Sequence, residues 1–132
     1  ILDFMKKLRK NKKTLNVLGN GLQKKAYLHV DDLINAMCFI NDKTKKGMNY
    51  FNIGPDDNGV LVSRIAEEVV KLISPQAKIN YQTTDRGWPG DVPNFSYSIN
   101  KLSKLGWSPT MSSLDAIKKA IRQIALQENL IE

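Results

Sequence analysis

The chain is poor in the residues that mark several classes of protein. It has one cysteine, Cys38, so no disulfide bond can form within it. Chains without disulfides are typical of reducing compartments, which predicts a cytoplasmic protein. Cys38 lies in the apolar run AMCFI at residues 36–40, without a basic neighbour. We therefore expect a small buried side chain there and not a reactive thiol.

Long hydrophobic runs are also missing. No apolar stretch approaches the roughly 20 residues of a membrane-spanning helix, and the first residues lack the pattern of a signal peptide. We therefore expect no membrane partner. With 132 residues, 42% hydrophobic and 25% charged, the chain is large enough for one domain with its own core. It begins with Ile1 inside a helical pattern, which predicts a piece of a longer protein.

Acidic residues are scarce in the first 26 residues, where Asp3 is the only one. The basic residues there are Lys6, Lys7, Arg9, Lys10, Lys12, Lys13, Lys24 and Lys25. Such a cluster attracts anions, either nucleic acid or a nucleotide diphosphate. No aromatic side chains alternate with it as base-stacking platforms would, which argues against nucleic acid. For the lysines of the opening helix, a solvated helix face is the simpler interpretation.

Hydrophobic periodicity predicts four main helices and a mixed α/β chain. The opening helix ends near Asn11, a second runs from a cap at Asp31 or Asp32 to about residue 40, and a third from a Ser63 cap to about residue 73. The last helix opens at Ser112 with Asp115 as a capping box. A short helix is expected between residues 98 and 106. The second helix is apolar nearly all round, so we expect it to be covered on two sides.

Four short strands are predicted at residues 15–18, 25–30, 49–53 and 78–82. The first two flank Gly19-Asn20-Gly21 and are expected to form a small hairpin, because Asn-Gly suits a tight turn. A long loop rich in glycine and proline follows at residues 83–96. Long loops are uncommon unless they are functional, so this loop and residues 19–32 are where we expect a site.

Each of these two segments offers groups that bind anions and sugars. Lys25, Tyr27 and His29 alternate along one predicted strand and would share a face. The later loop supplies Arg86 and Asp91. Arginine can clamp a phosphate, and a carboxylate can accept from sugar hydroxyls. The same loop also contains Trp88 and is stiffened by Pro89 and Pro93.

Four segments resemble those of one known family. Residues 19–32 read GNGLQKKAYLHVDD, similar to G-D-G-x-Q-x-R-D-[FY]-x-[YH]-V-x-D. Residues 51–54 (FNIG), 90–93 (GDVP) and 101–109 (KLSKLGWSP) resemble [YF]-N-[IL]-G, G-D-[VL]-P and K-x-x-x-L-G-[WF]-x-P. In this order the motifs resemble those of the extended short-chain dehydrogenases/reductases, and within them the NAD-dependent nucleotide-sugar epimerases and dehydratases of the UDP-glucose 4-epimerase type.

The resemblance implies a fold class and a role. The chain would be an α/β substrate-binding domain, residues 1–132, from the C-terminal part of a Rossmann-type enzyme, with the Rossmann core absent. NAD would be held by a glycine-rich turn in an N-terminal half, which would also carry the catalytic Tyr-x-x-x-Lys pair. No cofactor, metal or catalytic residue is then expected in this chain alone. The implied partners are a nucleotide-diphosphate sugar and that Rossmann half; a homodimer is left open for the longer protein.

The resemblance also implies roles for particular residues. Asn16 and Leu18 match strand positions that flank the nucleotide base. Lys25 stands where the family usually has an arginine that meets the diphosphate, with Tyr27 as the aromatic beside it. The family's carboxylate that accepts from the ribose matches Asp91.

Two further matches are less direct. Trp88 occupies the usual place of a second arginine, and Arg86 is the nearby residue that could replace it. His29 and Asp32 are expected to pack or cap.

One spacing suggests catalysis but is not expected to provide it. Tyr97 and Lys101 are four residues apart, as in the proton-transfer pair of many nicotinamide-dependent oxidoreductases. They follow the GDVP segment, where the family has a structural segment, so the resemblance implies that they are not this pair. From charge alone, the alternative function is a stand-alone anion-binding or nucleic-acid-binding module that uses the basic N-terminal segment.

Overall fold

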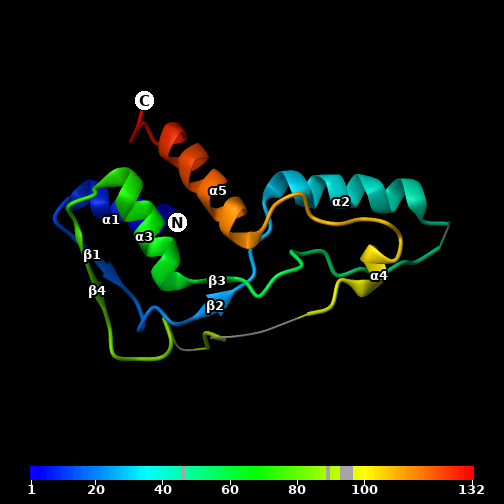
Figure 1. Ribbon diagram of the computed structural model, residues 1–132, viewed down its shortest axis with the longest axis horizontal. Coiled ribbons are helices and arrows are strands. Elements are labelled where there is room, and N and C mark those ends of the chain that lie inside the picture. Colours follow the sequence, from blue (N-terminus) through cyan, green and yellow to red (C-terminus); the bar gives the residue numbers. More distant parts are fainter. Residues whose placement is uncertain (46, 89, 93–96) are drawn as a thin grey trace.

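The computed structural model describes residues 1–45, 47–88, 90–92 and 97–132 (Figure 1). The helices are α1 (Leu2–Lys10), α2 (Val30–Lys43), α3 (Val62–Ile73), α4 (Asn100–Ser103) and α5 (Ser113–Gln127). The strands are β1 (Thr14–Val17), β2 (Lys24–Lys25), β3 (Val60–Leu61) and β4 (Lys78–Tyr81). The predicted class of mixed helices and short strands is confirmed. No helix in the described residues is long and apolar enough to cross a membrane.

The strands pair with partners far along the chain. β1 and β4 are parallel, with Leu15 opposite Ile79, and β2 and β3 are antiparallel, with Lys25 opposite Val60. The predicted hairpin between residues 15–18 and 25–30 is therefore wrong. Gly19 has the positive φ expected of a turn, but its N–H and C=O bond to Gln82, not to a neighbouring hairpin strand. Long-range pairing overrides the local turn signal here.

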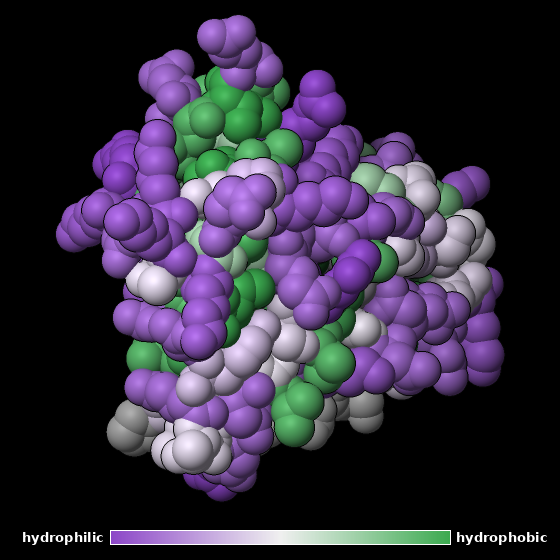
Figure 2. Space-filling model, turned by 60° about the vertical axis from the view of Figure 1, so that its left-hand side comes forward, coloured by the Kyte–Doolittle hydropathy of each residue, from purple (hydrophilic) through white to green (hydrophobic). Residues whose placement is uncertain are grey.

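The main core lies where α1, α3 and α5 pack together with the β1–β4 pair (Figure 1). It is built from apolar residues at helical spacing on the three helices and from alternate residues of β1. Its buried members are Met5, Leu8, Leu15, Val17, Val60, Ile65, Ala66, Val69, Val70, Ile117, Ile121 and Ala125. The three amphipathic helices predicted from the sequence thus converge on one core. In Figure 2 the left-hand side of the view in Figure 1 comes forward. Hydrophilic side chains cover much of this face, with hydrophobic ones between them.

A smaller cluster lies under α2. Ala36 packs with Leu102 and Trp107, and partly buried neighbours come from residues 28, 39–40, 51 and 53. The other side of α2 is open: Val30, Ile34 and Met37 are 58%, 53% and 54% exposed. Cover on two sides was predicted, and within this chain only one side has it. Cys38 is exposed for the same reason, so the prediction of a buried thiol is wrong.

The predicted helix caps are correct at one helix and wrong at another. Ser112 caps α5, and its side chain accepts from the Asp115 N–H as predicted. Ser63 does not cap α3, because the first N–H groups of that helix donate to the carbonyls of Gly21 and Gln23. Residues 49–53, all of them described, form no strand. Phe51 and Ile53 pack into the smaller cluster without a neighbouring strand to pair with.

Candidate functional site

A cavity of about 240 Å³ opens between α1, the end of β1, the start of α3 and the loop around residue 88. Four residues predicted as site residues line it: Leu18, Lys25, Tyr27 and Asp91. Leu18 lies at the rim and is about half exposed. The cavity thus joins the two segments that the sequence marked as candidates, although more than 60 residues separate Lys25 from Asp91.

Lys25 and Asp91 form the charged centre of this cavity. Lys25 Nζ lies 2.6 Å from Asp91 Oδ1, and only 2% of the Asp91 side chain is exposed. The hydrogen bond from Lys25 lowers the pKa of Asp91; burial opposes the shift, and the Gly87 N–H with the charges of Lys25 and Arg86 adds to it. The ammonium also lies 4.9 Å from the centre of the Trp88 ring. Asp91 is therefore held ionised, and Lys25 is held in place between a carboxylate and an aromatic face.

Tyr27 is positioned through its backbone. Its N–H donates to Ser113 Oγ at 3.0 Å, and Ser113 in turn donates to Asp57 from its hydroxyl and its N–H at 2.7 and 2.6 Å. Burial, and then the charge of Asp91, raises the pKa of Tyr27. Tyr27 therefore keeps its proton at neutral pH, and it offers a ring and a hydroxyl to a ligand but not a base.

The other two predicted residues are not among the described residues that line the cavity. Asn16 faces outward, where its Oδ1 accepts from Asn80 at 3.1 Å. Arg86 is exposed, and its charge acts on Asp91 from outside. Pro89 and Pro93, expected to stiffen the loop, lie outside the described residues. Trp88 lines the cavity, as its place in the sequence loop suggested.

Most of the lining residues were not predicted as site residues, and Lys7 and Gln23 are two of these with polar or charged side chains. Lys7 from α1 reaches the cavity, held by Asp3 at 2.8 Å and by the Asn16 carbonyl at 3.2 Å. It was grouped with the solvated lysines, although its spacing of four residues from Asp3 was a local sign of a positioned side chain. Gln23 matches the fixed glutamine of the G-D-G-x-Q-x-R pattern, but no role was predicted for it. It is buried and lines the cavity.

Tyr97 and Lys101 are arranged unlike a proton-transfer pair. Lys101 Nζ donates to the Tyr50 carbonyl at 2.7 Å and lies 4.4 Å from the centre of the Phe51 ring. Burial, and then the charge of Asp57, raises the pKa of Tyr97, whereas a tyrosine acting as base needs a lowered one. The tyrosine ring packs against Gly54, where an added Cβ would clash with it.

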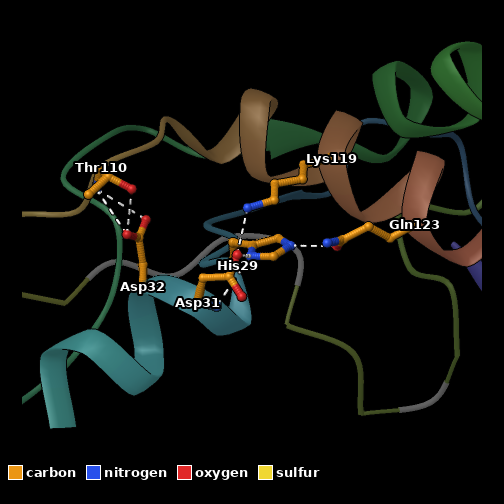
Figure 3. A network of polar contacts seen from close by, with 6 residues as sticks. All are labelled: His29, Asp31, Asp32, Thr110, Lys119 and Gln123. Atoms are coloured by element: carbon orange, nitrogen blue, oxygen red, sulfur yellow. Dashed lines mark hydrogen bonds and ion pairs between the residues drawn. The ribbon is translucent and has the colours of Figure 1, made fainter. Parts of the chain in front are cut away.

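His29 and Asp32 lie at the junction of α2 and α5, where they cap and pack and do not line the cavity (Figure 3). The predicted helix cap at Asp31 or Asp32 is wrong, because both residues lie inside the first turn of α2. His29 is the N-cap of α2: its Nδ1 accepts from the Asp31 N–H at 3.2 Å, and its Nε2 lies 2.8 Å from Gln123 Oε1.

The two carboxylates beside it complete the junction. Buried Asp32 accepts from the N–H and hydroxyl of Thr110, at 3.1 and 2.6 Å, and Asp31 pairs with Lys119 on α5. These contacts fix α2 relative to the rest of the chain and leave the cavity to other residues.

The cavity thus holds a lysine, a buried carboxylate and aromatic side chains, which are groups that can bind a small polar molecule. Comparisons with known proteins show which proteins the chain resembles. Residues 1–54 match the model of the NAD dependent epimerase/dehydratase family. The chain is similar to GDP-L-fucose synthase 1 of Arabidopsis thaliana (31% identical over 103 residues, 78% of this chain and 30% of that protein). It is also similar to human dTDP-D-glucose 4,6-dehydratase (28% over 125 residues, 89% of this chain and 34% of that protein).

Among solved structures, a UDP-galactose 4-epimerase resembles the chain with a TM-score of 0.76 and 32% identity. The match covers 95% of this chain and 39% of that one. The chain therefore spans about a third of the length of the curated relatives it matches. The predicted similarity to NAD-dependent epimerases and dehydratases is confirmed at this level.

Proposed function

We propose that the cavity binds the nucleoside diphosphate part of a nucleotide sugar, in an NAD-dependent epimerase or dehydratase. The observation that carries this proposal is the Lys25–Asp91 ion pair, which joins two motifs of the family resemblance in one cavity. The names of the relatives add support, because GDP-L-fucose, dTDP-D-glucose and UDP-galactose all contain a nucleoside diphosphate joined to a sugar.

The chemistry of the lining residues suits the parts of such a ligand. Lys25 supplies the charge for the diphosphate, as a point charge and not as the bidentate fork of an arginine. Asp91, kept ionised, accepts from a ribose hydroxyl, and Tyr27 lies beside both. Leu18 offers apolar contact for the base at the rim, and Asn16 and Arg86 would act from positions next to the cavity.

Lys7 is the second cation of this site. Its ammonium group is already held by Asp3 and the Asn16 carbonyl, so less side-chain entropy is lost when it meets an anion than for a free lysine. The remaining lysines of α1 that were predicted to be solvated, Lys6 and Lys10, are exposed and do not line the cavity in the described residues.

In the proposed longer protein, this chain is the C-terminal substrate-binding domain, residues 1–132. The sequence has no glycine-rich turn for NAD, so the cofactor and the catalytic pair would lie in an N-terminal Rossmann half. NAD supplies hydride transfer at a sugar carbon when it is bound there. The exposed apolar side of α2 is the surface where that half would dock, because apolar patches of this kind mark interfaces. A cytoplasmic, homodimeric enzyme fits the proposal.

The proposal is tested by titrating UDP and GDP into the chain by calorimetry. Lys25→Ala should weaken binding roughly tenfold to a hundredfold, because a charge-assisted hydrogen bond contributes about 1.5 to 3 kcal/mol. Arg86→Ala should weaken it less, since its charge acts from outside the cavity. NAD titrated in the same way should not bind at micromolar concentration.

The matched control removes two exposed lysines of α1, Lys6→Ala with Lys10→Ala, and should leave binding almost unchanged. If that double variant abolished binding and Lys25→Ala did not, the anion would bind on the helix surface. The stand-alone anion-binding or nucleic-acid-binding module would then replace the nucleotide-sugar site.

A further inference from the structure

One buried acceptor in the cavity has no partner. Only 2% of Gln23 is exposed, and its Oε1 is the single buried side-chain nitrogen or oxygen without a hydrogen bond among the described residues. A buried carbonyl oxygen left unpaired destabilises the folded chain, so nearly all such groups in proteins are satisfied. Because Gln23 lines the cavity, a donor group of the ligand is the natural partner for its amide oxygen.

The Gln23 amide lies directly beside Gly19. A Cβ added at Gly19 would clash with this amide, so the glycine leaves the space that the amide fills. Gly19 also has a φ of 78°, a conformation that side-chain-bearing residues rarely adopt. A residue with a side chain at position 19 would therefore displace the amide from the cavity wall.

Three acceptor-bearing groups gather around Gly87 at the edge of the cavity. A Cβ built there would lie 3.4 Å from Asp91 Oδ2, 3.8 Å from the Leu18 carbonyl oxygen and 3.9 Å from the Gln23 amide nitrogen. The amide, a carboxylate and a carbonyl thus border the same small space. Hydroxyl groups both donate and accept hydrogen bonds, so adjacent hydroxyls can meet the carboxylate, the carbonyl and the amide at this place.

We propose that Gln23 accepts a hydrogen bond from a ribose hydroxyl next to the one that Asp91 accepts, so that the site selects ribonucleotides over 2′-deoxyribonucleotides. This inference rests on the proposed function and concerns its specificity. The names of the relatives show that both kinds of nucleotide occur among similar proteins, since GDP and UDP have a 2′-hydroxyl and dTDP does not. Sites built to bond a hydroxyl reject the analogue that lacks it, because their own polar groups are left unpaired.

The test compares UDP with 2′-deoxy-UDP on the unaltered chain by calorimetry. UDP should bind at least roughly tenfold more tightly, which corresponds to the loss of one hydrogen bond to a buried acceptor. Gln23→Met keeps the length of the side chain and removes the acceptor. It should weaken UDP binding and leave 2′-deoxy-UDP binding nearly unchanged. The ratio of the two affinities should therefore fall toward one.

Gln76→Met is the matched control, because Gln76 is exposed in the turn between α3 and β4 and the preference should stay intact there. Equal affinity of the unaltered chain for the two nucleotides would overturn the inference while leaving the proposed function standing. A preference for UDP that persists in a folded Gln23→Met chain would also overturn it, since another group would then bind the 2′-hydroxyl. Failure of both nucleotides to bind would overturn the proposed function itself.

Discussion

The main core and the α2 region, which comprises α2, α4 and residues 49–54, use apolar residues differently. In the main core, α1, α3 and α5 each turn an apolar stripe inward, and the buried residues of all three helices form one cluster. In the α2 region, Ala36 is the only fully buried apolar residue of the helix, Phe39 and Ile40 are partly buried against its cluster, and Ile34 and Met37 are more than half exposed. The difference shows that the first region buries its apolar stripes within this chain, whereas the second leaves apolar side chains exposed.

Truncating one apolar side chain in each region tests this difference most directly. Leu15→Ala in β1 should lower the free energy of unfolding by about 2 to 5 kcal/mol, because it leaves a cavity in a fully buried site. Ile34→Ala on α2 should change it by no more than about 0.5 kcal/mol. Urea unfolding followed by circular dichroism measures both. Equal losses would mean that the open side of α2 is covered after all.

The network that joins the two regions should have an intermediate effect. Asp32→Ala removes the acceptor for the N–H and hydroxyl of Thr110 and should destabilise the chain by about 1 to 3 kcal/mol. Asp31→Ala is the control at the neighbouring position, where an exposed carboxylate pairs with Lys119, and little change is expected. The same urea experiment checks both variants. A harmless Asp32→Ala would show that α2 is held by apolar packing alone.

The smallest effect concerns acid and the loops attached to the main core. The pKa of Asp91 is lowered by its bond from Lys25; at Asp57 burial acts in the opposite direction, but hydrogen bonds from Ser113 and Gly59 outweigh it and lower the pKa. Groups with a lowered folded-state pKa stabilise fully above their ordinary value of 3.8 and lose this contribution as pH falls through the folded-state value. Unfolding free energy measured from pH 7 to pH 2 should therefore decline below about pH 4.

Asp91→Asn separates this effect from the general acid sensitivity of the chain. The variant should show a shallower decline below that pH, because one of the carboxylates with a lowered pKa no longer takes up a proton. If its acid profile had the same slope as that of the unaltered chain, Asp91 would not be the group that titrates.

Sequence patterns predicted the parts of the fold that depend on neighbouring residues. The stripes of α1, α3 and α5 repeat every three or four residues, and the Ser112 cap needs only Asp115, so both follow from local sequence. The hairpin was wrong because a glycine turn specifies a change of direction and not the partner strand. The partner of β1 is set by the burial of Leu15 and Val17 in a core whose other members lie far along the chain.

The candidate site was predicted in part for a similar reason. Lys25, Tyr27 and Asp91 lie in motifs of the family resemblance, and the structure brings them into one cavity. Lys7 and Gln23 reach the same cavity because α1 and the 21–23 backbone are packed there by contacts that no local pattern reports. Arg86 was proposed from its nearness in sequence to Asp91, but it is exposed and does not line the cavity.

The parallel pairing of β1 with β4 also has a consequence for how the chain folds. Opposite residues such as Asn16 and Asn80 are 64 positions apart, so this pair cannot form as a hairpin does from adjacent segments. A long loop has to close before any hydrogen bond of the pair is made, and α3 has to be in place to cover it. Folding should therefore be slower than for a helical bundle of the same length, with the three helices formed early and the β1–β4 junction late in the transition.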